Sequence, residues 1–206
     1  MRSRTTVELF QYWNDVRGNR DLPRRDEIQP GDIRSLLPNV FILQTEPAGG
    51  IYFRLAGTNI CSLFGNELRH RQFSSLWRGD QQEDIGRIAR QAIESCTPIV
   101  LAASGATAAG DWLDLEILMT PLASRDGKGD RVLGALSPLS GPMWLHMMPL
   151  QHLMLEQVQE NSEVPEMLTR AGNTVIRLDT HRSPIRRANT FRYSRAEDGI
   201  EPSLVQ

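Results

Sequence analysis

Two hydrophobic periods alternate along this chain, and their order predicts its secondary structure. Residues 112–119 alternate between apolar side chains and the acidic Asp114 and Glu116, as in a strand with one buried face. Residues 80–95 instead carry apolar side chains at helical spacing and predict the most regular helix of the chain. Further strands are predicted at 40–44, 51–55, 99–103 and 132–136, with short helices between the second strand and the long helix. Five antiparallel strands with helices grouped on one face make an α+β fold.

The first 26 residues form a predicted amphipathic helix, ending near Gly18, and a polar linker. Phe10 and Trp13 fall on its apolar face, with Tyr12 beside them. Such a face must pack either on the chain's own sheet or on a second copy of the protein. We therefore predict Phe10, Tyr12 and Trp13 as a homodimer interface and keep packing within one chain as the alternative.

The main domain is predicted to span residues 27–140, and residues 141–206 form a C-terminal extension. The extension opens with a methionine-rich stretch that suits either an adaptable partner surface or a cover for the core. A short helix is expected near residues 150–159. Arginines accumulate after about residue 180 with few apolar residues between them, so this basic tail is expected to be disordered.

Composition narrows the function classes. The 206 residues are 40% hydrophobic and 23% charged with a net charge of −2, which fits a globular domain and disfavours nucleic acid as a partner. Cys61 and Cys96 form neither a disulfide framework nor a zinc-ligand pattern. No signal peptide or membrane span is apparent, so the expected location is cytoplasmic.

Several short motifs, in this order, resemble those of PAS domains, and in particular the short stand-alone PAS proteins typical of alphaproteobacteria. The matching stretches are Arg20-Asp-Leu-Pro23, Leu37-Pro38, Phe53-Arg-Leu-Ala-Gly-Thr58, Phe64-Gly65, Leu115-Glu-Ile-Leu118, Pro121-Leu122 and Asp130-Arg-Val-Leu-Gly134. The resemblance implies a PAS fold with a five-stranded antiparallel sheet. It also implies a sensory or interaction module that binds a ligand between sheet and helices, or pairs through its outer surfaces.

An interior pocket for a small apolar or amphipathic ligand is the candidate site. Its predicted lining consists of apolar residues from the strands and helices around the sheet: Phe53, Leu55, Ile60, Leu63, Phe64, Ile88, Ile93, Leu115 and Ile117. The alternative is that these side chains simply fill a close-packed core.

The reactive side chains of the sequence do not form a recognisable catalytic, cofactor-binding or metal-binding pattern. Cys61 lacks the surrounding polar residues of a flavin-adduct cysteine and is predicted to be structural. The long helix carries no histidine, and His70 lies on a loop, so haem is not expected either. Asp114 and Glu116 have no accompanying nucleophile and base. We therefore predict no catalytic residue, no metal and no cofactor, with haem and flavin disfavoured.

Three functions compete. We predict a non-catalytic PAS sensory or regulatory module that binds a small ligand, a partner protein of a signalling pathway, or both. The alternative is a ligand-free structural dimerisation adaptor, which would also be a homodimer. The third hypothesis is an enzyme that uses Asp114 and Glu116.

Overall fold

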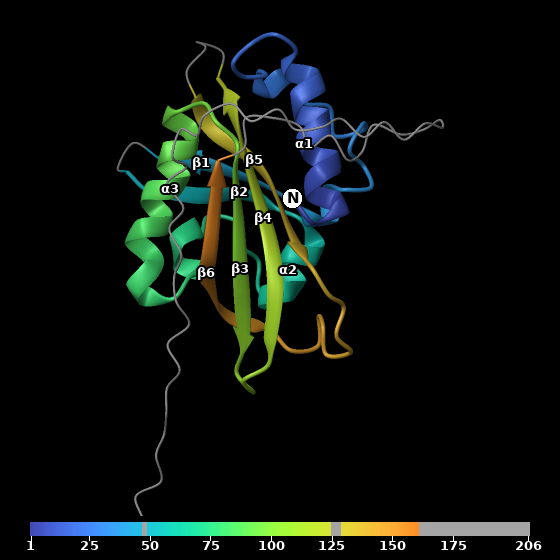
Figure 1. Ribbon diagram of the computed structural model, residues 1–206, viewed down its shortest axis with the longest axis vertical. Coiled ribbons are helices and arrows are strands. Elements are labelled where there is room, and N and C mark those ends of the chain that lie inside the picture. Colours follow the sequence, from blue (N-terminus) through green and yellow to red (C-terminus); the bar gives the residue numbers. More distant parts are fainter. Residues whose placement is uncertain (47–48, 125–128, 161–206) are drawn as a thin grey trace, which may run out of the picture.

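The computed structural model describes residues 1–46, 49–124 and 129–160 and shows one antiparallel sheet in the spatial order β2-β1-β5-β4-β3-β6 (Figure 1). The predicted α+β fold is confirmed, and the sheet has six strands where five were predicted. The strands are β1 (Val40–Thr45), β2 (Ile51–Ala56), β3 (Ile99–Thr107), β4 (Trp112–Ala123), β5 (Gly129–Pro138) and β6 (Leu150–Glu160).

Helices lie over both faces of the sheet. The inner face is covered by α2 (Thr58–Phe64) and α3 (Gln82–Glu94), together with the short 3₁₀ turns η3 (Phe73–Leu76) and η4 (Gly79–Gln81). The N-terminal helix α1 (Arg4–Arg17) packs on the outer face against β4 and β5 (Figure 1). Two further turns, η1 (Arg25–Glu27) and η2 (Leu37–Asn39), precede β1. Within the described residues, no helix is long and apolar enough to cross a membrane.

Each face has its own hydrophobic core. The inner core is dominated by aromatic rings from β1, β2 and η3, with Phe53 and Phe73 in edge contact at a centroid distance of 5.7 Å. The outer core holds Phe10 and Trp13 of α1 against side chains of β4 and β5. The indole Nε1 of Trp13 donates a hydrogen bond to the carbonyl oxygen of Pro121 at 2.8 Å. That buried bond fixes α1 on the sheet of its own chain.

The sixth strand lies where the sequence predicted a short helix near residues 150–159, and that prediction is wrong. β6 pairs with β3, and the pairing shifts by one residue at two β-bulges. The bulges bring Leu150, Leu153, Leu155 and Val158 to the inner core at spacings of three, two and three residues. A bulge adds one residue to a period of two, so these strand positions imitate helical periodicity. The basic tail predicted after about residue 180 lies outside the described residues.

Two glycines in the matching motifs are required by close packing. A Cβ on Gly57 would lie 2.3 Å from the carbonyl oxygens of Leu37 and Pro38. A Cβ on Gly134 would lie 2.2 Å from the ring of Phe41, its cross-strand partner. Both distances are impossible for real atoms, so these motifs hold η2 against α2 and make room for an aromatic ring in the inner core.

Candidate ligand-binding cleft

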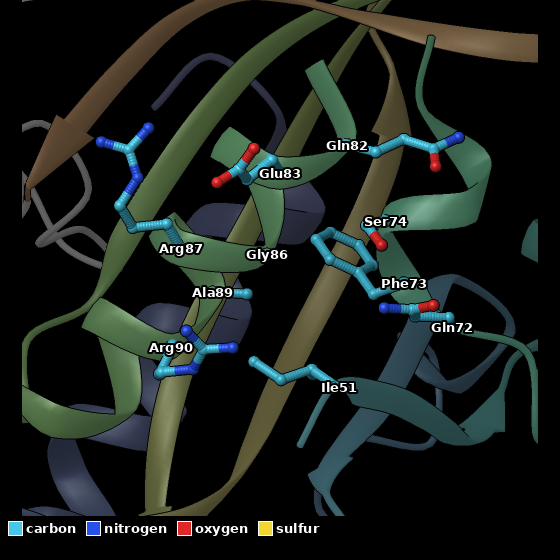
Figure 2. A pocket seen from close by; sticks show the side chains of 11 residues that line it. Ile51, Gln72, Phe73, Ser74, Gln82, Glu83, Gly86, Arg87, Ala89 and Arg90 are labelled. Atoms are coloured by element: carbon cyan, nitrogen blue, oxygen red, sulfur yellow. The ribbon is translucent and has the colours of Figure 1, made fainter. Parts of the chain in front are cut away.

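A cleft of about 360 Å³ opens between α3 on one side and η3 with the start of β2 on the other. Figure 2 shows Gly86 and Ala89 of α3 facing Phe73 and Ser74 of η3 across it. This volume lies within the range of small-molecule sites in proteins. Its lining combines apolar and polar residues: Gly50, Ile51, Gln72, Phe73, Ser74, Gln82, Glu83, Gly86, Arg87, Ala89 and Arg90.

The cleft is held open by the way its two walls are attached. On α3, Ile85 and Ala89 are buried against the sheet, and the neighbouring polar helix face borders the cleft. The opposite wall is tied to β2, because Phe53 accepts a hydrogen bond from the amide of His70 at 2.8 Å and donates one to Arg71 at 2.9 Å. The two walls are therefore attached to different parts of the sheet.

Charge at the cleft comes from α3. Arg87 pairs with Asp84 one turn earlier on the helix. Arg90 also lines the cleft and forms no ion pair within the described part of the chain. Glu83 is the one acid of the lining. The cleft thus presents, beside an apolar floor, a guanidinium that has no ion pair among the described residues.

The residues predicted to line an interior pocket are gathered by the structure, with one exception. Phe53, Ile60, Leu63, Phe64, Ile93, Leu115 and Ile117 are buried in the inner core, and Ile88 is partly buried against them. The lining of the cleft includes none of these residues. A ligand among them would need the core to open, and that pocket stays a prediction.

Leu55 is the exception, because its side chain is 46% exposed. Ile42 pairs with Leu55 and Leu43 pairs with Phe53, so Arg54 is left over in β2 as a bulge. The extra residue turns Leu55 away from the inner face, where simple alternation had placed it. Its assignment to the interior pocket is therefore corrected.

Asp114 and Glu116 lie in different environments. Asp114 is exposed, whereas Glu116 is only 2% exposed under the start of α1. The carboxylate of Glu116 accepts hydrogen bonds from the backbone amides of Arg2, at 2.7 Å, and Ser3, at 2.9 Å, and from the hydroxyl of Thr6. These contacts give Glu116 a structural task at a helix N-terminus, where a carboxylate is favoured.

Cys61 and His70 both lie at the periphery of the inner core. Burial raises the pKa of the Cys61 thiol, and the nearby carboxylate of Glu67 raises this pKa further. A raised pKa keeps the thiol protonated and weakens it as a nucleophile. His70 is exposed, adopts a left-handed backbone conformation with φ of 67°, and borders a separate 130 Å³ hollow with Tyr52.

The predicted dimer residues lie within one chain's own core. Phe10 and Trp13 are each 1% exposed in the single chain. Tyr12 is half-buried, and its hydroxyl accepts a hydrogen bond from the amide of Gln29 at 2.8 Å. An interface through Phe10 and Trp13 would require α1 to leave this face, and homodimerisation stays a prediction.

Gly86 and Arg90 were missed by the sequence analysis, which followed only the apolar stripe of this helix. A signal was present, because a glycine inside an otherwise good helix is unfavourable and asks for a reason. Arg87 and Arg90 come after it on the adjacent helix face. The pattern of apolar residues identifies the face of α3 that packs in the core. The cleft borders the neighbouring, partly polar face, which this pattern does not mark.

The architecture is an antiparallel sheet with short helices gathered over its inner face. Residues 1–137 match a sequence family described as PAS domain, and the chain belongs to that family. The resemblance inferred from the motifs is confirmed at this level. The match includes α1, and the predicted boundaries after residues 26 and 140 stay predictions. No curated protein matches the sequence.

Several solved structures are similar to this chain at low sequence identity. A light-oxygen-voltage domain studied with a flavin analogue is 14% identical, covers 53% of this chain and 83% of its own, and has a TM-score of 0.43. The Rhodobacter sphaeroides LOV protein is 17% identical, with coverages of 51% and 61% and a TM-score of 0.40. A PAS domain from Colwellia psychrerythraea is 14% identical, with coverages of 53% and 97% and a TM-score of 0.40.

The sequence-based prediction of no cofactor, with flavin disfavoured, is contradicted by these neighbours, which include light-oxygen-voltage domains. The inner core of this chain holds aromatic rings in the space between sheet and helices. Phe73 lies 6.1 Å from Phe41 and 6.0 Å from Trp77, measured between ring centroids.

Proposed function

We propose that this chain is a non-catalytic sensory module that binds a small ligand in the cleft between α3, η3 and β2. The observation that carries the proposal is the 360 Å³ cleft itself, which opens beside a tightly packed core and combines an apolar floor with polar groups. The family match supports a sensory role, and the cleft supports binding of a small ligand as the signal.

Ligand binding would reach the rest of the molecule through the start of α3. The side-chain amide of Gln81 accepts a hydrogen bond from the amide of Leu155 at 2.8 Å and donates one to its carbonyl oxygen at 3.5 Å. Just before it, the amide of Arg78 donates to Leu153 at 2.8 Å. A ligand that prefers one spacing between η3 and α3 would therefore bias the position of β6.

The readout of this change is a partner surface, either on a signalling protein or on a second copy of the chain. Homodimerisation, a cytoplasmic location and kinship with the stand-alone alphaproteobacterial PAS proteins stay predictions from the sequence. They are compatible with a module whose output passes through α1 or β6.

The alternative function is a ligand-free adaptor. Its support is a different feature, the connection between β5 and β6, where Met143 is 95% exposed and Met147 is 72% exposed. Exposed methionines suit an adaptable protein contact. In this function the cleft would be unused.

The deciding experiment is a thermal-shift screen of a metabolite library against the full chain and the Gly86→Leu variant. Leucine favours helix and its side chain would enter the cleft, because a Cβ on Gly86 meets no atom of another described element within 4 Å. We expect compounds that raise the melting temperature of the wild-type chain and leave that of Gly86→Leu unchanged.

Compounds that stabilise both variants equally would bind elsewhere and would overturn the cleft as the sensory site. Circular dichroism of Gly86→Leu checks that the fold is retained. An absorbance spectrum of the freshly purified chain tests for bound flavin or haem in the same preparation.

A further inference from the structure

Gly86 is a helical residue, and nothing in residues 1–46, 49–124 and 129–160 requires it to be glycine. It lies inside α3, and a Cβ added there meets nothing within 4 Å. Glycine is among the least favourable residues in a helix interior. Its contrast with Gly57, where a Cβ would strike backbone atoms, shows that packing explains one glycine and leaves the other unexplained. The direct consequence of glycine at position 86 is a wider cleft.

The bottom of the cleft is apolar and shielded from water. Ile51, Phe73 and Ala89 are at most 3% exposed. Ser74 is 7% exposed and also lines the cleft, and its hydroxyl donates no hydrogen bond to any residue in the described ranges. A ligand oxygen in the cleft would give this hydroxyl an acceptor.

The charged groups that border the cleft are Glu83, Arg87 and Arg90. Arg87 is already held by Asp84, and Figure 2 shows Arg90 at the end of the cleft where Ala89 and Ile51 lie. A guanidinium pairs with a carboxylate through two parallel hydrogen bonds. Arg90 is therefore the group available for an anionic ligand.

We infer that the cleft binds a small organic carboxylate, with its carboxylate on Arg90 and its apolar body on the floor formed by Ile51, Phe73 and Ala89. Gly86 leaves room for that body, and Ser74 donates to a ligand oxygen. This inference rests on the proposed function of the cleft and adds the chemical class of the ligand.

The test compares benzoate with benzamide, which share a ring and differ in the charge of the polar group. Binding is followed in the full chain by amide chemical-shift changes in nuclear magnetic resonance spectra. We expect saturable changes in α3 and η3 with benzoate, and affinity for benzamide weaker by about tenfold. Arg90→Gln should remove this preference, and Gly86→Leu should abolish both responses.

Arg34→Gln is the matched control, because Arg34 is exposed, lies outside the cleft and changes the net charge equally. It should leave the preference for benzoate intact. Equal binding of benzoate and benzamide would overturn the carboxylate class while the ligand cleft itself stands. Loss of the preference in Arg34→Gln as well, or no change in α3 and η3 at about 10 mM benzoate, would also overturn the inference.

Discussion

Glu116 illustrates how a single side chain acquires its role from its neighbours. On a strand with an exposed outer face, an acidic residue is ordinarily solvated. Here α1 covers that face, and the carboxylate receives the amides of Arg2 and Ser3, which have no partner within the helix. The N-cap residue Ser3 supplies no side-chain hydrogen bond of its own, so β4 provides the cap.

Replacing Glu116 by alanine should therefore destabilise the domain. Two backbone amides and one hydroxyl would lose a buried acceptor, which we expect to lower the free energy of unfolding by about 2–3 kcal/mol. Urea denaturation of the purified variant measures this change. Asp114→Ala, on the same strand but exposed, is the control and should change stability by no more than about 0.5 kcal/mol. Equal effects of both substitutions would contradict the capping role.

At the scale of elements, the sequence is informative where a strand keeps a regular period and misleading where a bulge interrupts it. Strand β4 keeps a period of two over residues 113–119, so its type and its inner face were predictable, whereas the burial of Glu116 and Leu118 on the other face was not. Leu55 and the strand β6 were misplaced, because one extra residue reverses the face of every residue after it. A single sequence carries no mark that distinguishes a bulge from the regular strand.

The candidate site was less predictable than the fold for a related reason. Hydrophobic patterning identifies residues that share a core, and it correctly grouped Phe53, Ile60 and Ile117. A cleft depends instead on the distance between its two walls. That distance is determined by the attachment of residues 70–72 to β2 and of α3 to the sheet. The local clue in the sequence was Gly86, because a glycine inside a helix lowers its stability and no neighbouring residue explains its presence.

β6 should be an integral part of the domain. Leu153 is fully buried in the inner core, whereas Gln151 on the same strand is exposed. Leu153→Asp would place a carboxylate in that core and remove apolar contacts, so we expect a loss of about 3–5 kcal/mol or complete unfolding. Gln151→Asp should remain within about 0.5 kcal/mol of the wild-type chain in the same urea titration. A folded Leu153→Asp variant with unchanged stability would show that β6 is dispensable.

At the scale of the whole molecule, the position of α1 decides how a second copy could dock. The outer face of a sheet is a natural protein contact, and α1 occupies its β4–β5 part with Phe10 and Trp13. The guanidinium of Arg17 lies 5.1 Å from the Trp13 ring centroid, which closes the helix over this core. A homodimer would therefore have to use the exposed side of α1 or another part of the sheet, or else exchange α1 between copies.

Trp13→Ala separates packing within one chain from exchange between copies. With α1 on its own sheet, the variant should lose about 3–5 kcal/mol of stability, because a buried aromatic ring and its hydrogen bond to Pro121 disappear. The loss should be the same at roughly 1 and 100 µM protein, and the mass measured by sedimentation should equal that of the wild-type chain. If α1 were exchanged, the wild-type chain would be a dimer whose melting temperature rises with protein concentration, and the variant would have half the wild-type mass. Tyr12→Ala, which removes a half-buried ring from the same helix, should cost about 1 kcal/mol and leave the mass unchanged in either case.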